Sequence, residues 1–179
     1  MAPTVRSIAL PSEAATAELG AALADALLAM ADDVRDHGFS IGLTGDLGAG
    51  KTALVRALLR RAGASGTVKS PTFALLEPYE LSRLNFYHFD FYRFKDPAEF
   101  RDRGFEEYFA PGAVCLVEWP ERAQGYLPEP DLLIELAVDP NPRAGEGSGG
   151  PPAEAPRRAQ LKALTRLGEQ CLQRMTIPQ

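Results

Sequence analysis

The sequence is poor in the residues that crosslink small secreted proteins or anchor a chain in a membrane. It has only two cysteines in 179 residues, Cys115 within an apolar run and Cys171 within a predicted helix. Two such thiols do not make a disulfide framework, so we interpret both as reduced. No stretch reaches the ~18–20 uninterrupted apolar residues that a membrane span needs. The Ala- and Leu-rich segment 14–31 contains acidic residues and lacks a basic leader. We therefore expect a cytoplasmic protein with no membrane association.

Positive charge is also in short supply. Lys and Arg number 19 against 24 Asp and Glu, so the formal net charge is -5. An acidic chain has no overall field that attracts a phosphate backbone. Composition therefore gives no support for direct binding of DNA or tRNA. The hydrophobic share of 45% is ordinary for a folded protein, and the length suits one domain over residues 1–179.

One stretch carries the strongest chemical signal. Residues 45–52 read GDLGAGKT and fit the phosphate-binding pattern G-x-x-x-x-G-K-[ST] without a mismatch. A short apolar segment at 39–44 precedes the pattern as a predicted strand, and residues 53–62 follow it with helical periodicity. Gly63 comes next as the expected C-terminal cap. The sequence thus predicts the strand–loop–helix unit of a P-loop nucleotide-binding protein.

The residue types of this loop explain how it holds a phosphate. Glycines let successive backbone N–H groups face an anion that a Cβ would keep away. The N-terminus of the following helix adds partial positive charge. We expect the Lys51 ammonium to reach the β- and γ-phosphates and the Thr52 hydroxyl to bind Mg²⁺. The predicted contacts to a nucleoside triphosphate come from Asp46, Leu47, Gly48, Ala49, Gly50, Lys51 and Thr52.

Further elements are predicted on both sides of this unit. Ser12 is a plausible N-cap for a helix that runs to about residue 37. Segments 73–77 and 86–92 are close enough in sequence to form an antiparallel pair, with Pro78 in the turn. Asp96 is the expected N-cap of a helix that breaks near Gly104. The remaining strands are predicted at 4–10, 113–117, 130–139 and 158–164, and a closing helix at 165–175.

The order of these elements defines the expected fold class. It is an α/β fold, a three-layer P-loop NTPase-like domain with a mixed, mainly parallel β-sheet flanked by helices. From residue 140 to 156 the composition shifts to Gly, Pro, Ala and Ser. We interpret residues 140–156 as a flexible loop insertion without catalytic duty.

Two acidic residues stand at or near the ends of predicted strands. Glu118 follows the apolar run 113–117, the pattern by which P-loop proteins deliver a carboxylate to the metal or the attacking water. Asp90 lies among apolar strand residues, where a carboxylate is unfavourable unless it is paired or metal-bound. We predict a metal role for Glu118, while the sequence does not rank the two acids as base or metal ligand.

Three features each support two interpretations. Thr72, in the polar loop 65–72, either approaches the γ-phosphate or belongs to an ordinary connection. Trp119 either forms a wall of the nucleotide site or lies in the core. The aromatic row at 86–94 could stack bases, but such side chains also suit a half-buried strand. The acidic net charge favours the strand interpretation.

Taken together, these stretches resemble the bacterial TsaE (YjeE) family, the small ATPases of tRNA threonylcarbamoyladenosine synthesis. The phosphate loop is the generic part of the resemblance. Four further segments make it specific, and they match in order and spacing across nearly the whole chain. They are VKSPTF at 68–73, EPY at 77–79, YHFDFYR at 87–93 and VEWP at 117–120.

The resemblance implies a P-loop fold that hydrolyses ATP with Mg²⁺. It also implies partnership with the TsaD–TsaB complex, which transfers threonylcarbamoyl to the adenosine beside the anticodon. In that family ATP hydrolysis supports sustained turnover of the complex and is not the transfer chemistry itself. The expected partners are therefore the TsaD–TsaB complex and, through it, tRNA.

The resemblance also assigns roles to individual residues. It implies that Lys51, Asp90 and Glu118 are catalytic, and that Thr52 and Glu118 form the Mg²⁺ site. Two further residues resemble nucleotide contacts of the family. Glu13 looks like a residue that lines the base pocket, and Arg157 looks like a nucleotide-contacting arginine. The insertion before Arg157 is the departure from the family pattern.

Other classes of protein also contain a phosphate loop. A small-molecule kinase usually has an arginine-bearing lid, and residues 140–156 carry only Arg143 in their body. A GTPase is disfavoured because the sequence has no Asn-Lys-x-Asp segment to read guanine. A nucleotide-dependent binding module overlaps with the family role. No obvious arginine finger is present, so we expect slow hydrolysis by the isolated chain and activation by partners.

Overall fold

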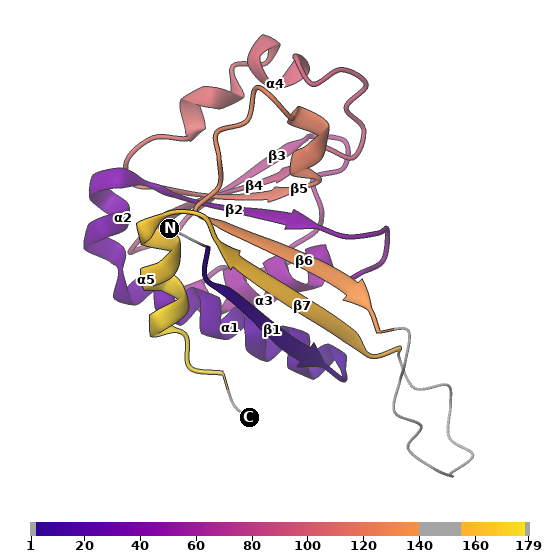
Figure 1. Cartoon of the computed structure of the whole chain (residues 1–179). Helices are drawn as coiled ribbons and strands as arrows, with labels where there is room; N and C mark the ends of the chain where they lie inside the picture. The colour runs from indigo at the N-terminus through magenta and orange to yellow at the C-terminus, as the bar shows by residue number, and fades with distance from the viewer. Residues whose placement is uncertain (1–2, 140–154, 178–179) are drawn as a thin grey trace.

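The computed structural model of the protein describes residues 3–139 and 155–177, which build one seven-stranded sheet and its covering helices (Figure 1). The strands are β1 Val5–Leu10, β2 Phe39–Thr44, β3 Leu76–Glu80, β4 Asn85–Asp90, β5 Ala113–Glu118, β6 Leu132–Val138 and β7 Arg157–Ala163. The helices are α1 Glu13–Ala29, α2 Ala31–His37, α3 Lys51–Ala62, α4 Glu99–Asp102 and α5 Arg166–Arg174, with 3₁₀ turns η1 Phe105–Tyr108 and η2 Pro120–Ala123. Strands and helices mostly alternate along the chain, although β3 is followed directly by β4 and β6 by β7.

The sheet has a parallel centre and antiparallel edges. The strand order is β1-β7-β6-β2-β5-β4-β3, and the pairs β6–β2, β2–β5 and β5–β4 are parallel. The outer pairs β1–β7, β7–β6 and β4–β3 are antiparallel. The central strands β2 and β5 are buried almost throughout because both faces of each are covered. The mixed α/β sheet expected from the sequence is confirmed.

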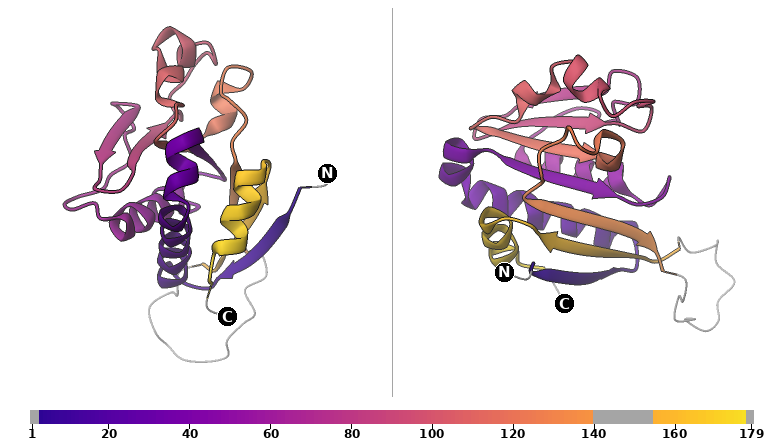
Figure 2. Two further views of the ribbon diagram at one scale, coloured as in Figure 1. Left: turned by 90° about the vertical axis from the view of Figure 1, so that its left-hand side faces the viewer. Right: turned by 45° about the horizontal axis from the view of Figure 1, so that its top comes forward.

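Helical segments lie on both sides of the sheet (Figure 2), and two separate hydrophobic cores hold the layers together. The larger core joins α1, α3 and α5 to one face of the sheet. The smaller one lies on the other face, where η1 and the segment around α4 cover β4 and β5 with aromatic side chains. The outer face of β6 and β7 is largely open to solvent, for example at Glu135, Ala137 and Gln160. The third layer therefore covers only the part of the sheet nearest β4.

The aromatic row predicted at 86–94 belongs mainly to these cores. Phe89, Phe91 and Phe94 are buried in the smaller core, where Phe91 and Phe94 stack with ring centroids 4.4 Å apart. Phe86 is buried in the larger core. Among the aromatic residues of the row, only Tyr92 is well exposed, at 39%. The row thus consists mainly of core residues, as the strand interpretation expected, although Phe91, Tyr92 and Phe94 lie beyond the end of β4 at Asp90.

The structure differs from the sequence prediction at the first helix. One helix to about residue 37 was expected, but the chain turns at Met30, whose backbone angles leave the helical region. Among the described residues no single helix is both long and apolar enough to cross a membrane. Helices α1 and α2 meet that test only as a pair, and the chain bends by 74° between them. The turn lets Val34 of α2 accept a hydrogen bond from the Gly112 backbone before β5.

The antiparallel pair is present, but its first strand is shifted. Residues 71–74 form a turn closed by a bond from the Leu75 N–H to the Pro71 carbonyl, and Leu75 has a left-handed backbone (φ 67°). The strand therefore starts at Leu76 and includes Pro78, which was expected in the turn. A proline is tolerated there because β3 is an edge strand, where its missing N–H costs no ladder bond.

The later elements follow the prediction with smaller changes. The expected helix after Asp96 shrinks to the single turn α4, with Ala98 at its N-cap position, although the Asp96 carboxylate accepts a bond from the Ala98 N–H at 2.8 Å. Helix α5 begins as expected, with Thr165 accepting from the Gly168 N–H. Residues 140–154 of the predicted insertion lie outside the described residues. Its ends are joined by a 2.7 Å bond from the Asp139 N–H to the Pro156 carbonyl.

Both cysteines are free and buried, in line with the interpretation of reduced thiols. Cys115 lies in the smaller core and Cys171 in the larger one. Burial raises the pKa of the Cys171 thiol to about 12, and it raises the pKa of the Cys115 thiol as well. Neither sulfur is therefore a ready nucleophile or metal ligand.

Replacing Gly20 by alanine is expected to destabilise the protein. A Cβ at Gly20 would lie 2.7 Å from the Ala57 Cβ and 2.8 Å from the Leu54 carbonyl oxygen, because α1 and α3 touch at this point. Forced overpacking of this kind costs about 1–3 kcal/mol, which exceeds the gain of up to ~1 kcal/mol from helix propensity. Urea unfolding should show a lower midpoint. The exposed Glu18→Ala change in the same helix is the control, and a raised midpoint for Gly20→Ala would contradict the close crossing.

Candidate functional site

The phosphate loop lies between the end of β2 and the start of α3. Gly48 (φ 79°) and Gly50 (φ 107°) adopt left-handed backbone angles that other residues rarely tolerate. Gly50 is also the N-cap of α3, and its carbonyl accepts the first helical bond from the Leu54 N–H at 3.0 Å. The loop backbone therefore presents the N-terminus of a twelve-residue helix toward the carboxyl edge of the sheet.

Lys51 is buried and held over the loop. Its Nζ donates to the Gly45 carbonyl and, at 2.9 Å, to the Asp46 carbonyl. The same ammonium lies 4.1 Å from the centroid of the Trp119 ring, a cation–π contact. Burial lowers the Lys51 pKa below its ordinary value, while neighbouring carboxylates, Glu118 first among them, oppose this shift. The lysine is thus a desolvated cation surrounded by acidic groups.

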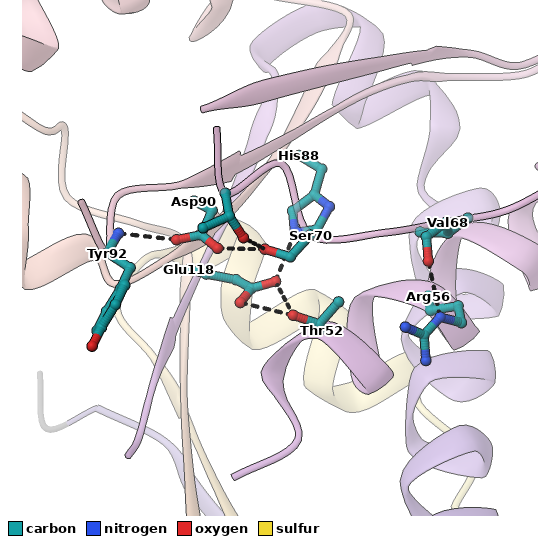
Figure 3. A network of polar contacts seen from close by, with 9 residues as sticks. Thr52, Arg56, Val68, Ser70, His88, Asp90, Tyr92 and Glu118 are labelled. Atoms are coloured by element: carbon teal, nitrogen blue, oxygen red, sulfur yellow. Dashed lines mark hydrogen bonds and ion pairs between the residues drawn. The ribbon is translucent and has the colours of Figure 1, made fainter. Parts of the chain in front are cut away.

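Glu118 ends β5 and is almost fully buried, at 3% exposure. The Thr52 hydroxyl donates to its Oε1 at 2.9 Å and approaches Oε2 at 3.1 Å (Figure 3). On its other side, Oε1 lies 2.8 Å from Nε2 of His88. Strand β5 and helix α3 therefore bring together the two residues that the sequence predicted for Mg²⁺, Thr52 and Glu118.

Asp90 ends the neighbouring strand and sits opposite Glu118 in the parallel register. Its Oδ2 accepts a bond from the Ser70 hydroxyl, and its Oδ1 accepts one from the Tyr92 N–H at 2.9 Å (Figure 3). These two bonds compensate the burial of a side chain that is only 5% exposed. Asp90 is thereby tied to the polar loop 65–72, and Thr72 of that loop donates to the Ser70 hydroxyl at 3.4 Å.

Lys51, Thr52, Ser70, Thr72, Asp90 and Glu118 line one pocket of about 450 Å³. This volume is within the size range of small-molecule sites. The wall of the pocket includes Thr72 and Trp119. The sequence supported two interpretations for each of these residues. Of the predicted site residues, Ala49 is a buried residue of the loop, and the backbone carbonyl of Asp46 accepts a hydrogen bond from Lys51. The other predicted residues line the pocket: Glu13, Leu47, Gly48, Gly50, Lys51, Thr52, Asp90, Glu118 and Arg157.

Several residues of the site were not predicted, Tyr92 among them. Ser70 and His88 bond to the two acids, and Arg56 lines the pocket while its Nε donates to the Val68 carbonyl at 3.0 Å. The helical periodicity of residues 53–62 places Arg56 opposite the apolar side chains and gives no sign of a role in the site. Ser70 and His88 fall inside the specific segments 68–73 and 87–93, which was the available signal. Sequence spacing did not show which acid each one contacts.

Thr52 and Glu118 have oxygen atoms of the kind that bind Mg²⁺. Among residues 3–139 and 155–177 there is no cluster of three or more His, Cys, Asp or Glu side chains arranged to hold a metal. Mg²⁺ in phosphate-transfer sites needs fewer protein groups, because it keeps waters and takes phosphate oxygens. A hydroxyl and a carboxylate in contact beside a phosphate loop, as in Thr52 and Glu118, fit that requirement.

A phosphate loop at the carboxyl edge of a parallel sheet, with an acid on the adjacent strand, defines a nucleotide-binding protein of the P-loop class. The comparison with protein families gives the particular family. The family model described as "Threonylcarbamoyl adenosine biosynthesis protein TsaE" matches residues 10–144. The chain belongs to the TsaE family.

Individual relatives agree with this membership. A protein of Haemophilus influenzae named "tRNA threonylcarbamoyladenosine biosynthesis protein TsaE" is 41% identical over 127 residues, which cover 71% of this chain and 78% of that protein. A Bacillus subtilis protein of the same name is 42% identical over 94 residues, 52% of this chain and 58% of that protein. The crystal structure of Bacillus subtilis YdiB superposes with a TM-score of 0.71 over 97% of this chain and 95% of that one. Its identity is 23%, so it supports the fold alone.

Proposed function

We propose that this protein is a Mg²⁺-dependent ATPase that acts in the formation of threonylcarbamoyladenosine in tRNA. Its role there is to support turnover of the TsaD–TsaB transferase complex, with tRNA reached through that complex. The membership in the TsaE family supports the process. The observation that carries the chemistry is the bonded pair Thr52–Glu118 at the mouth of the phosphate loop.

The proposed reaction is in-line attack of water on the γ-phosphate of ATP. The loop N–H groups bind phosphate oxygens, and Lys51 exchanges its two carbonyl partners for the β- and γ-phosphates. Thr52 and Glu118 would hold Mg²⁺, which neutralises charge that develops on the phosphates. Asp90, held by Ser70 and the Tyr92 N–H, is oriented toward the same pocket to accept a bond from the attacking water.

Two arginines line the pocket, and each has a different relation to the loop. Arg56 is engaged with the Val68 carbonyl. Arg157 lies against Gly50, and its Nη2 is 3.5 Å from the Gly48 carbonyl. The Nε of Arg157 is buried without a hydrogen-bond partner, so an oxygen of the nucleotide would satisfy it. We assign Arg157 to nucleotide binding and Glu13, at the start of α1, to the base side of the pocket.

The function is tested by measuring ATP hydrolysis by the purified chain, alone and with the TsaD–TsaB complex. We expect slow hydrolysis alone and stimulation by the complex. GTP as competitor tests the choice of base, and a screen for phosphorylated metabolites tests the kinase alternative. Absence of stimulation, together with a phosphorylated product, would overturn the proposed function in favour of a kinase.

ATP binding is expected to change the fluorescence of Trp119, the only tryptophan in the chain. The Lys51 ammonium now lies over the ring, and it must leave that position to reach the phosphates. A titration with Mg-ATP should therefore give a saturable change in emission. Trp119→Phe is the control that removes the signal while keeping a ring. If ATP binds by calorimetry without any change in emission, Lys51 does not leave the ring.

A further inference from the structure

The side chain of His88 makes a contact that the proposed reaction does not yet use. His88 is completely buried, at 0% exposure, in the middle of β4. It pairs with Leu116 across the parallel ladder, and Asp90 pairs with Glu118 two residues further along. Because side chains alternate between the faces of a sheet, His88, Asp90 and Glu118 all lie on the same face. His88 therefore reaches Glu118 diagonally from inside the core.

The hydrogen bonds around His88 select one tautomer. Its Nε2 lies 2.8 Å from Oε1 of Glu118, and a carboxylate can only accept, so the proton belongs on Nε2. Its Nδ1 is buried and has no hydrogen-bond partner. A proton on Nδ1 would leave a buried donor unsatisfied, which is less favourable than a buried lone pair. The surroundings thus favour an imidazole that donates to Glu118 and to nothing else.

The same oxygen of Glu118 accepts from two directions. The Thr52 hydroxyl donates to Oε1 from the pocket side at 2.9 Å, and His88 donates from the core side. Together these bonds fix both the rotamer of Glu118 and the plane of its carboxylate. With its proton committed to Glu118, Thr52 keeps its oxygen lone pairs available to the pocket.

We propose that His88 is a positioning residue that holds the Glu118 carboxylate, and through it the Thr52 hydroxyl, in the orientation that takes Mg²⁺. This inference rests on the proposed function of Thr52 and Glu118 as the metal site. Residues that hydrogen-bond to metal-binding side chains typically change metal affinity or activity by about 10–100-fold when they are removed. The alternative is a histidine that only fills the core.

A set of substitutions at one position separates the two roles. His88→Gln places an amide N–H near the position of Nε2, whereas His88→Asn has the donor on a side chain too short to reach Glu118. His88→Leu removes the donor and keeps an apolar core. We expect Asn and Leu to lower kcat and to raise the Mg²⁺ concentration for half-maximal nucleotide binding, each by about 10–100-fold. The KM for ATP at saturating Mg²⁺ should be nearly unchanged, and Gln should restore most of the loss.

A measurement without nucleotide or metal tests the contact itself. The chain has only two histidines, His37 and His88, so their ring nitrogens can be assigned by ¹⁵N NMR. We expect His88 to be the Nε2–H tautomer with a hydrogen-bonded proton, and Glu118→Gln to shift that signal while leaving the exposed His37 unchanged. An Nδ1–H tautomer of His88 would overturn the proposal. A His88 signal that is the same in the wild type and in Glu118→Gln would also overturn it.

The outcomes of the two experiments are distinguishable. If the wild-type chain neither binds nor hydrolyses Mg-ATP, the proposed function fails, whatever the NMR spectrum shows. If it does both and folded Asn and Gln variants have equal kcat and equal Mg²⁺ dependence, His88 is only a core residue and the inference fails. Thermal melts of every variant report the folded fraction, and the Asn–Gln comparison still decides if His88→Leu does not fold.

Discussion

Lys51→Ala is expected to reduce ATP hydrolysis by about 100-fold or more, the scale seen when one preorganised donor to a developing charge is removed. The present contacts of the ammonium, two loop carbonyls and the Trp119 ring, are uncharged, and we expect a phosphate to replace them. The measurement is steady-state phosphate release with and without the TsaD–TsaB complex. We expect stimulation by the complex to disappear as well.

The matched control is Lys69→Ala, which removes the same charge from an exposed position of the loop 65–72. It should leave the basal rate close to that of the wild type. Lys51→Arg is a second comparison, because a planar guanidinium does not replace a compact ammonium in a tight site. Hydrolysis that survives Lys51→Ala would show that the measured activity arises elsewhere.

Glu118→Gln is expected to lower hydrolysis by about 100-fold while nucleotide binding changes far less. The substitution keeps the size of a side chain that is buried between Thr52 and His88, so packing is preserved. It removes the negative charge of the carboxylate that we propose as a ligand of Mg²⁺. Rates over a range of Mg²⁺ concentrations, and ATP affinity by calorimetry, separate the two effects.

The control for this prediction is Glu129→Gln, an exposed acid that is not among the residues lining the pocket in the described part of the chain. Its removal should leave the Mg²⁺ dependence unchanged. If Glu118→Gln weakens ATP binding as strongly as it weakens hydrolysis, or lowers the melting temperature enough to explain the loss, Glu118 has a structural role instead.

The parts of the fold that the sequence predicted are those with a local cause. The loop 45–52 depends on glycines at fixed positions and on the strand and helix beside it, so a short window contains the whole signal. The end of β5 at Glu118 was visible as an apolar run that stops at an acid. Thr165 caps α5 through its own side chain, again a local interaction.

Where the sequence prediction was wrong or incomplete, the cause is an interaction with residues that are distant in sequence. No Gly or Pro marks the turn at Met30, because packing of α2 beside β5 decides it. Pro78 fits a strand only because β3 is an edge, and strand order is a property of the whole sheet. The bonds Ser70–Asp90 and His88–Glu118 join segments 20 and 30 residues apart. They follow from tertiary register, which the spacing of residues in one sequence does not reveal.

The strand order also has a consequence for how the protein is made. Strand β2, which carries the phosphate loop, has β5 and β6 as its two neighbours, and these are synthesised some 70 to 90 residues later. Pairing between such distant segments is slow, because a large loop must close first. Arg157, against Gly50, arrives later still. A nascent chain on the ribosome therefore cannot complete the pocket before β5, β6 and Arg157 have emerged, so nucleotide binding requires all of these segments.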